Sequence, residues 1–236
     1  MRILQTIVNG PEPCPYLADQ SWTMKYQHIG EMEPGEYERR LRLGWFKFGA
    51  FLQRPICEGC NECLSMRVPM DEWQPNRIQR RTLAKNAELR IEVSTPPICD
   101  PERLLLYNRY RIAQTQEKGW TPTLMDSVSY QREFLVGPTE MTEISVWEGN
   151  RLKAIVLTDV EPNAVAGVTH YYDPDWRERS IGLFAMLQTF LLARELGKKW
   201  VYLGYYVENS PTMGYKLQFR PCELRGWDGT WERIEK

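Results

Sequence analysis

The sequence predicts an α+β fold in which helices cover a sheet. Three β-rich runs lie at residues 142–148, 152–160 and 164–172. A Glu-Gly-Asn turn and a Glu-Pro-Asn turn join them, which is typical of an antiparallel meander. Residues 180–197 then form a helix that is apolar on nearly all sides, as expected for a helix between a sheet and its neighbours. Residues 200–207 return as a strand, and this order indicates an α+β sandwich.

The first half of the chain carries shorter elements. Apolar and polar residues alternate over residues 21–30, which predicts a strand. Residues 34–43 are expected to form a short helix with proline in its first turn and glycine directly after it. Strands are expected at residues 45–53 and 63–70, and residues 77–86 form a basic helical segment.

A proline-rich joint at residues 94–101 suggests a domain boundary. Asp100 is expected to cap a helix that begins at Pro101 and stops at Gly119. We therefore expect an N-terminal cysteine-rich region for substrate or metal binding at residues 1–95 and a catalytic α+β domain at residues 96–236.

Composition excludes several classes of protein. The chain of 236 residues is 42% hydrophobic and 26% charged, which excludes a disordered, collagen-like or coiled-coil chain. Its formal net charge of -1 means that any RNA contact must be a local patch. No signal-peptide core and no apolar run of about 18 residues occurs. We expect a soluble cytoplasmic protein with reduced thiols and no membrane partner.

Four cysteines form a candidate metal site. Cys57, Cys60 and Cys63 lie in the motif CEGCNEC, and Cys14 lies in PCPYL. Such spacing is typical of ligands to an iron–sulfur cluster or to tetrahedral zinc, and the spacing does not choose between them. The alternative is burial as small apolar residues. The Pro, Glu, Gly and Asn residues around these cysteines disfavour a core strand, so the sequence favours metal ligands.

The remaining cysteines and histidines give little material for catalysis. Cys99 and Cys222 stand apart from the cluster and are expected to be structural. His28 and His170 are the two histidines of the sequence, and both fall in strand-like runs. We expect them to be packed or surface residues rather than a catalyst or a metal site.

The order of elements resembles the GNAT acyltransferase fold. In that fold a loop rich in Arg and Gly precedes the central helix, and here RERSIG occupies residues 177–182. Free N–H groups at such a helix start can hold an anion. The alternative is an ordinary serine cap at Ser180.

Several motifs in order resemble the aminoacyl-tRNA–protein transferase family of the N-degron pathway of protein degradation. They are PCPYL, RPICEGCNECLSMRVPMDEWQPNRIQRR, LTDV, THYYDPDWRERSIGLFAML and VYLGYYVENSPTMGYK, and they span nearly the whole chain. The bacterial aspartate/glutamate leucyltransferase branch is more similar than the arginyltransferases of eukaryotes. The resemblance implies a GNAT-like fold with an N-terminal cysteine-containing region.

This resemblance also implies an activity and partners. Leucine would pass from leucyl-tRNA to the N-terminal α-amine of proteins that begin with Asp or Glu, and the chemistry would require no cofactor. Eukaryotic relatives bind an iron–sulfur cluster or zinc through N-terminal cysteines, to which Cys14, Cys57, Cys60 and Cys63 are comparable. The even spacing of the last three departs from the eukaryotic arrangement.

The expected chemistry needs positioning more than a strong base. The acceptor α-amine has an ordinary pKa of about 7.7–8.0, so part of it is neutral at pH 7. Orientation and oxyanion donors can supply much of the acceleration. Asp159, at the end of an apolar strand, is the candidate to hold the ammonium or accept its proton, and turn capping is the alternative. Tyr205 is the second catalytic candidate. Because side chains alternate along a strand, at most one of Tyr205 and Tyr206 should face the cleft, and simple sheet packing is the alternative for both.

Substrate recognition calls for cations, because a guanidinium pairs bidentately with a carboxylate. The substrate-binding candidates are Arg67, Arg77, Arg80, Arg81, Tyr206, Tyr215 and Lys216. The basic residues of the 77–86 segment could instead hold tRNA phosphates or form a solvated helix face. We expect the 77–81 segment and Asp159 to share one crevice.

Three other functions stay open at this point. The donor could be arginyl-tRNA, because the sequence alone does not distinguish the two aminoacyl pockets. The RERSIG loop permits a GNAT N-acetyltransferase that uses acetyl-CoA, although Ser180 replaces an expected glycine. A non-catalytic, metal-stabilised RNA-binding module would need only the cysteines and the basic segment.

Overall fold

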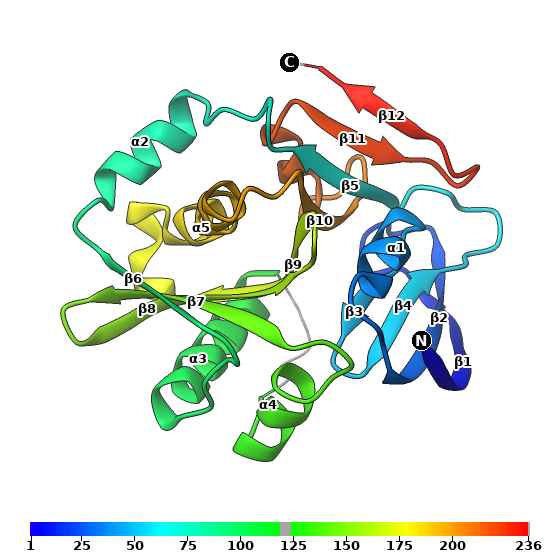
Figure 1. The fold of residues 1–236 in the computed structure, drawn as a ribbon, viewed down its shortest axis with the longest axis horizontal. Coiled ribbons are helices and arrows are strands. Elements are labelled where there is room, and N and C mark those ends of the chain that lie inside the picture. Colours follow the sequence, from blue (N-terminus) through cyan, green and yellow to red (C-terminus); the bar gives the residue numbers. More distant parts are fainter. Residues whose placement is uncertain (119–123, 236) are drawn as a thin grey trace.

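The computed structural model describes residues 1–118 and 124–235, and it contains two sheets (Figure 1). The small sheet is antiparallel with the order β1-β2-β4-β3. Its strands are β1 (Arg2–Pro13), β2 (Ser21–Glu31), β3 (Phe46–Phe48) and β4 (Phe51–Pro55), and α1 (Glu36–Arg42) connects β2 to β3. The small sheet packs beside the large sheet (Figure 1).

The large sheet has eight strands in the order β12-β11-β5-β10-β9-β8-β7-β6. Its strands are β5 (Leu64–Pro69), β6 (Arg90–Ser94), β7 (Met141–Glu148), β8 (Arg151–Val160), β9 (Ala164–Tyr172), β10 (Trp200–Tyr206), β11 (Cys222–Arg225) and β12 (Trp231–Ile234). The pair β9 and β10 is parallel, and its register covers only three residue pairs. Beyond them β9 stays paired with β8 while β10 pairs with β5, so the two strands diverge.

Helices cover both faces of the large sheet (Figure 1). On one face lies α5 (Ile181–Glu195), with α2 (Arg77–Lys85) against its outer side. On the other face lie α3 (Pro101–Lys118) and α4 (Ser127–Phe134). Two 3-10 segments, η1 (Pro174–Arg179) and η2 (Gly214–Gln218), precede α5 and follow β10. No helix in the described part of the chain is long and apolar enough to cross a membrane.

The near-continuous apolar character of β8 and α5 follows from this layering. Every residue of β8 from Leu152 to Asp159 is buried, because helices cover both of its faces. The helix α5 is buried between the sheet and α2, and Phe190 on it contacts the rings of Trp73 and Phe219. The apolar residues on all sides of α5 therefore each have a packing partner.

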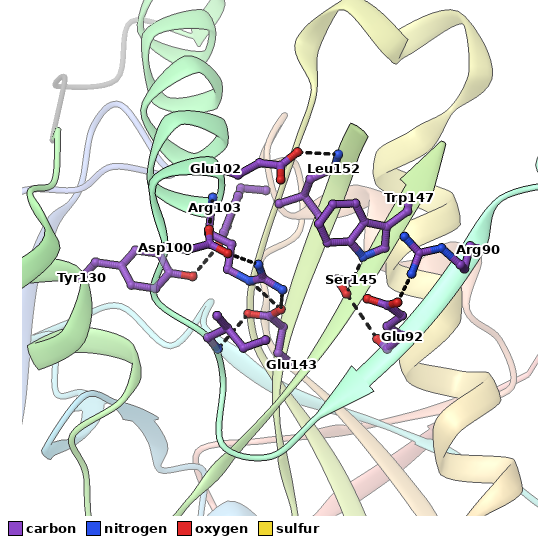
Figure 2. A network of polar contacts seen from close by, with 12 residues as sticks. Arg90, Glu92, Asp100, Glu102, Arg103, Tyr130, Glu143, Ser145, Trp147 and Leu152 are labelled. Carbon is purple, nitrogen blue, oxygen red and sulfur yellow. Dashed lines mark hydrogen bonds and ion pairs between the residues drawn. The ribbon is translucent and has the colours of Figure 1, made fainter. Parts of the chain in front are cut away.

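A buried network of charged groups fixes α3 to the sheet (Figure 2). Arg103 on α3 donates from Nε to Glu143 Oε1 of β7 at 2.8 Å, and the two residues are 3% and 0% exposed. Asp100 accepts a hydrogen bond from the Arg103 backbone N–H at 2.8 Å, which confirms the predicted cap. Glu102 accepts one from the Leu152 backbone N–H at 2.9 Å. These contacts set the orientation of α3.

The predicted GNAT-like α+β fold is confirmed, including the meander β7-β8-β9, the central helix α5 and the strand β10. The predicted division at residues 95 and 96 does not coincide with the division between the sheets, because β5 and β6 belong to the large sheet. The predicted helix end at Gly119 lies outside the described residues. The additional strands β1, β6, β11 and β12 and the helix α4 were not predicted.

Candidate active site

A cavity of about 560 Å³ opens where β9 and β10 diverge. Aromatic and aliphatic side chains from α3, β9, α5 and β10 form most of its wall, and η2 closes one side. Representative wall residues are Tyr107, Val168, Leu183, Met186 and Leu203. A volume of several hundred Å³ with mostly apolar walls and a few polar groups is typical of a small-ligand pocket.

A β-bulge shapes the β9 wall. Leu157 of β8 lies opposite Thr169, and Thr158 lies opposite Gly167, so Val168 is the extra residue between them. Bulges redirect side chains and locally end ladder pairing, and they are frequent beside active sites. All three β9 residues line the cavity.

Lys216 is the buried cation of the cavity. It lies on η2, is 7% exposed, and donates from Nζ to the Tyr205 backbone carbonyl at 2.6 Å. A bulge in β10 presents this carbonyl, and the bulge requires glycine because Gly204 has a φ of 77°. Burial lowers the pKa of Lys216 to about 8.

The polar side chains of the described cavity wall include bases but no acids. Arg111 of α3 and His170 of β9 line it together with Lys216, and Tyr215 directs its hydroxyl to Met186 Sδ at 3.6 Å. No Asp or Glu is among the described residues of the wall. The described wall therefore offers an apolar surface with basic residues and no carboxylate to pair with a cationic ligand group.

Asp159 does not line this cavity. On β8, Leu157 packs with α3 and α4 while Val156 packs with α5, so alternation directs Asp159 away from α5. Its Oδ1 lies 2.6 Å from Lys47 Nζ of β3 and accepts a hydrogen bond from Thr139 Oγ1 at 2.8 Å. The side chains of Asp159 and Lys47 are each 1% exposed. This ion pair joins the small sheet to the large one.

The prediction that Asp159 and the 77–81 segment share one crevice is wrong. Arg77, Arg80 and Arg81 are exposed on α2, which lies on the outer side of α5 (Figure 1). Asp159 points to the opposite face of the large sheet, where it meets Lys47. The strand alternation that buries Asp159 therefore also separates it from these arginines.

Three further candidates lie away from the cavity. Tyr205 directs its hydroxyl to the Gly44 carbonyl at 2.7 Å, beside the small sheet. Tyr206 packs in the core beneath α5. Arg67 pairs with Glu223, with Nη2 2.6 Å from Oε2, and its guanidinium lies 3.9 and 4.0 Å from the ring centres of Trp200 and Trp231. Of the predicted substrate-binding residues, Tyr215 and Lys216 line the cavity.

Two family descriptions match separate parts of the chain. Residues 12–81 match the N terminus of arginine-tRNA-protein transferase, and residues 102–226 match its C terminus. The chain belongs to the arginine-tRNA-protein transferase family. Its predicted membership of the aminoacyl-tRNA–protein transferases is thereby confirmed.

Individual relatives of this transferase are similar over most of their length. An aspartate/glutamate leucyltransferase of Pseudomonas aeruginosa (strain LESB58) is 35% identical over 216 residues, covering 91% of this chain and 90% of the relative. One from Campylobacter jejuni serotype O:2 is 30% identical over 226 residues, covering 95% and 93%.

A solved domain assigned to a lysylphosphatidylglycerol synthetase of Agrobacterium fabrum has a similar fold, with a TM-score of 0.51 and 12% sequence identity. The match covers 74% of the transferase and 59% of that structure. At this identity the similarity concerns the fold alone.

The four N-terminal cysteines of the transferase lie near one another, because Cys57, Cys14 and Cys60 all influence Cys63. Burial, followed by the neighbouring Cys57, Cys14 and Cys60, raises the pKa of Cys63 to about 12. Metal ligation needs the thiolate, so a metal bound here would have to displace the thiol protons. Among the described residues, no group of three or more Cys, His, Asp or Glu is arranged to hold a metal ion. The zinc or iron–sulfur site at these cysteines stays a prediction.

Sequence reasoning missed part of the transferase cavity. Tyr107, Tyr110 and Arg111 line it from α3, and their spacing of three and four residues on one helix was the available signal. His170 was expected to be packed or at the surface, and it lines the cavity beside the β9 bulge. Tyr16, close to Cys14 in the sequence, reaches the same cavity.

Proposed function

We propose that this transferase moves leucine from leucyl-tRNA to the α-amine of proteins that begin with Asp or Glu. The observation that carries the choice of donor is the apolar cavity between β9 and β10, whose described wall contains no acidic residue. Burying a leucine side chain there is favourable by about 1.5–3 kcal/mol. An arginyl group would instead place a guanidinium beside Arg111 and Lys216 without a carboxylate to pair with it.

The proposed reaction balances as an aminolysis. The acceptor nitrogen forms a bond to the ester carbonyl carbon, the ester C–O bond breaks, and the ribose hydroxyl of tRNA leaves. The α-ammonium must first lose a proton, and its ordinary pKa of about 7.7–8.0 is close to the lowered pKa of Lys216, about 8. We assign neutral Lys216 as the group that accepts this proton and then returns it to the leaving ribose oxygen. The second proton that the nitrogen loses as the amide forms passes to solvent.

The start of α5 favours tRNA over acetyl-CoA as donor. The arginines of the 177–182 loop already have partners, because Arg177 pairs with Glu117 and Arg179 pairs with Glu88. A Cβ built at Gly182 would lie 2.6 Å from Tyr172 Cε1, so the first turn of α5 is tightly packed. A pyrophosphate at this helix start would compete with these ion pairs.

The proposal also covers the cellular setting. The six cysteines are free thiols, which is typical of a reducing compartment. We place the reaction in the cytoplasm, where aminoacyl-tRNA is made.

A donor assay tests the proposal. Purified protein is incubated separately with radiolabelled leucyl-tRNA, arginyl-tRNA or acetyl-CoA and with peptides that begin with Asp, Glu or Ala. We expect label from leucyl-tRNA on the Asp and Glu peptides. Transfer from arginyl-tRNA or acetyl-CoA instead would show that leucyl-tRNA is not the donor. Equal transfer to the Ala peptide would refute the proposed acceptor specificity. Absence of transfer from every donor would favour a binding module.

A further inference from the structure

A second, smaller hollow lies next to the large cavity. Its volume is about 20 Å³, and it lies between the turn after α1, the end of β4 and the turn between β11 and β12. About 10–15 Å³ of such volume holds one water molecule, so the hollow has room for a single compact polar group. Tyr205 lines it, and the backbone carbonyl of the same residue accepts the hydrogen bond from Lys216.

Two arginines line this hollow without a carboxylate bound to them. Arg54 comes from β4 and Arg225 from the end of β11. In the described part of the chain, neither makes a salt bridge; the guanidinium of Arg54 lies 6.0 and 5.9 Å from the ring centres of Trp45 and Trp227. Burial, followed by the charge of Arg54, lowers the pKa of Arg225. The two cations therefore repel one another in a partly desolvated place.

Unpaired donors accompany these charges. Arg225 Nε and Trp227 Nε1 are buried and have no hydrogen-bond partner in the structure. Arg225 Nη1 donates a hydrogen bond of 3.3 Å to Gly226 O. The nearby Asp228 favours the charge of Arg225, but Asp228 Oδ1 already accepts hydrogen bonds from the backbone and hydroxyl of Thr230 at 3.0 and 2.8 Å. Buried donors without acceptors are rare, and these two donors beside two arginines can serve an anionic acceptor.

A third arginine extends the positive charge. Arg40 of α1 stacks on Trp45, with its guanidinium carbon 4.3 Å from the ring centre, and its Nε is also buried without a partner. Burial and the charge of Arg54 lower the pKa of Arg40 as well. Arg67 differs in this respect, because Glu223 already occupies its guanidinium.

We propose that the hollow between Arg54 and Arg225 binds the side-chain carboxylate of the acceptor's N-terminal Asp or Glu. This inference rests on the proposed function and adds the determinant of acceptor specificity. The small volume of the hollow fits one carboxylate. Tyr205 lines the hollow and its carbonyl binds Lys216, so the bound carboxylate would lie close to the group that takes the proton of the α-amine. A guanidinium pair distinguishes a carboxylate from the neutral amide of Asn or Gln, which cannot satisfy the charge.

Transfer kinetics test the inference. With leucyl-tRNA as donor, Arg54→Gln and Arg225→Gln should each raise the KM for a peptide that begins with Asp by roughly 10–100-fold, the range expected for lost charged hydrogen bonds. Their preference for Asp over Asn peptides should fall, and their KM for leucyl-tRNA should stay unchanged. The matched control is Arg151→Gln, an exposed arginine at the first position of β8, which should behave as wild type.

Other outcomes identify other ligands. If the two variants raise the KM for leucyl-tRNA and leave the peptide KM unchanged, the hollow binds a tRNA phosphate and the inference is wrong. Unchanged kinetics for both substrates would also overturn it. Circular dichroism and thermal unfolding check that the variants fold, and Arg54→Lys, which keeps the charge but loses the planar fork, should show a smaller loss of Asp preference.

A binding measurement separates this inference from the proposed function. Trp45 and Trp227 lie beside Arg54, so their fluorescence should report on occupancy of the hollow. In the absence of tRNA, the Asp peptide should change the fluorescence of the wild type but not of Arg225→Gln, and the Asn peptide should bind at least roughly tenfold more weakly. Such binding without any aminoacyl transfer would keep the site and refute the proposed reaction. Equal binding of the Asp and Asn peptides would refute the site.

Discussion

Lys216 connects the geometry of the cavity to the proposed proton transfer. Its burial disfavours the charged form, so the ammonium loses its proton near pH 8 instead of near pH 10.5. Gly204 holds this arrangement, because its positive φ forms the bulge that presents the Tyr205 carbonyl to Nζ. The position of the Lys216 amino group thus depends on a glycine in β10 and on the lysine itself in η2.

The proton-transfer role predicts a pH dependence. Below pH 8 Lys216 is mainly protonated and cannot accept the ammonium proton, so kcat should rise with pH through about 8. Lys216→Arg keeps the charge but cannot lose a proton, so it should lower kcat by about 10²–10⁴-fold and leave only the shallower rise that comes from the α-amine, whose ordinary pKa is about 7.7–8.0. The measurement is single-turnover transfer at saturating peptide between about pH 6.5 and 9. A Lys216→Arg variant with the wild-type rate and pH profile would show that Lys216 acts only through its charge.

The pair of Lys47 and Asp159 predicts a structural effect rather than a catalytic one. Removing one partner leaves a buried charge alone, so Lys47→Met should lower the free energy of unfolding by about 3–5 kcal/mol. The double variant Lys47→Met with Asp159→Leu should recover much of this loss and keep transfer activity. Urea unfolding measures the first effect and the leucine transfer assay the second. If Asp159→Asn abolished transfer without lowering stability, Asp159 would have the catalytic role that its position argues against.

At the scale of elements, we make one prediction for α2 and one for the cysteine loop, residues 57–63. Exposed Arg77, Arg80 and Arg81 are three and four residues apart, and so form one basic helix face outside the cavity. None of the three is among the described residues that line the cavity, so we expect them to contact the body of a large donor rather than the acceptor side chain. The cysteine loop, in contrast, contributes the half-buried thiol of Cys63 next to Tyr16 of the cavity wall.

For α2 we expect an effect on tRNA alone. Replacing the three arginines with glutamine should raise the KM for leucyl-tRNA and reduce the salt slope of tRNA binding by roughly 0.7–0.9 for each lost phosphate contact. The KM for the peptide should not change. Binding titrations over a range of salt concentrations check this, with the exposed Arg132→Gln on α4 as control. An unchanged salt slope would assign α2 to a solvated surface.

For the cysteine loop we expect independence from metal. Because burial and the neighbouring cysteines raise the pKa of Cys63 to about 12, its thiol should react slowly with iodoacetamide at pH 8. Treatment with a strong zinc and iron chelator should leave transfer activity unchanged, because the proposed aminolysis uses no metal ion. Loss of transfer on chelation, restored by added zinc or iron, would contradict this expectation.

At the scale of the whole molecule, the elements that could be predicted from the sequence are those that local patterns determine. The meander β7-β8-β9 has its turns and alternation within a few residues, and α5 has a continuous apolar run, so both could be recognised. The position of β5 between β10 and β11, and the meeting of Lys47 with Asp159, depend on contacts between distant segments. Local signals do not specify such contacts. For the same reason Lys216 could be named as a cation near the cleft, whereas Arg54 could not.

The most direct test of the central claim is a crystal structure with a stable leucyl-adenosine amide. The claim is that the space between the diverging strands β9 and β10 holds the aminoacyl end of the donor. The account predicts the leucine side chain against Val168, Met186 and Leu203, with the carbonyl group on the side of Lys216. Electron density for the leucyl group outside this cavity, with the cavity empty, would contradict the account.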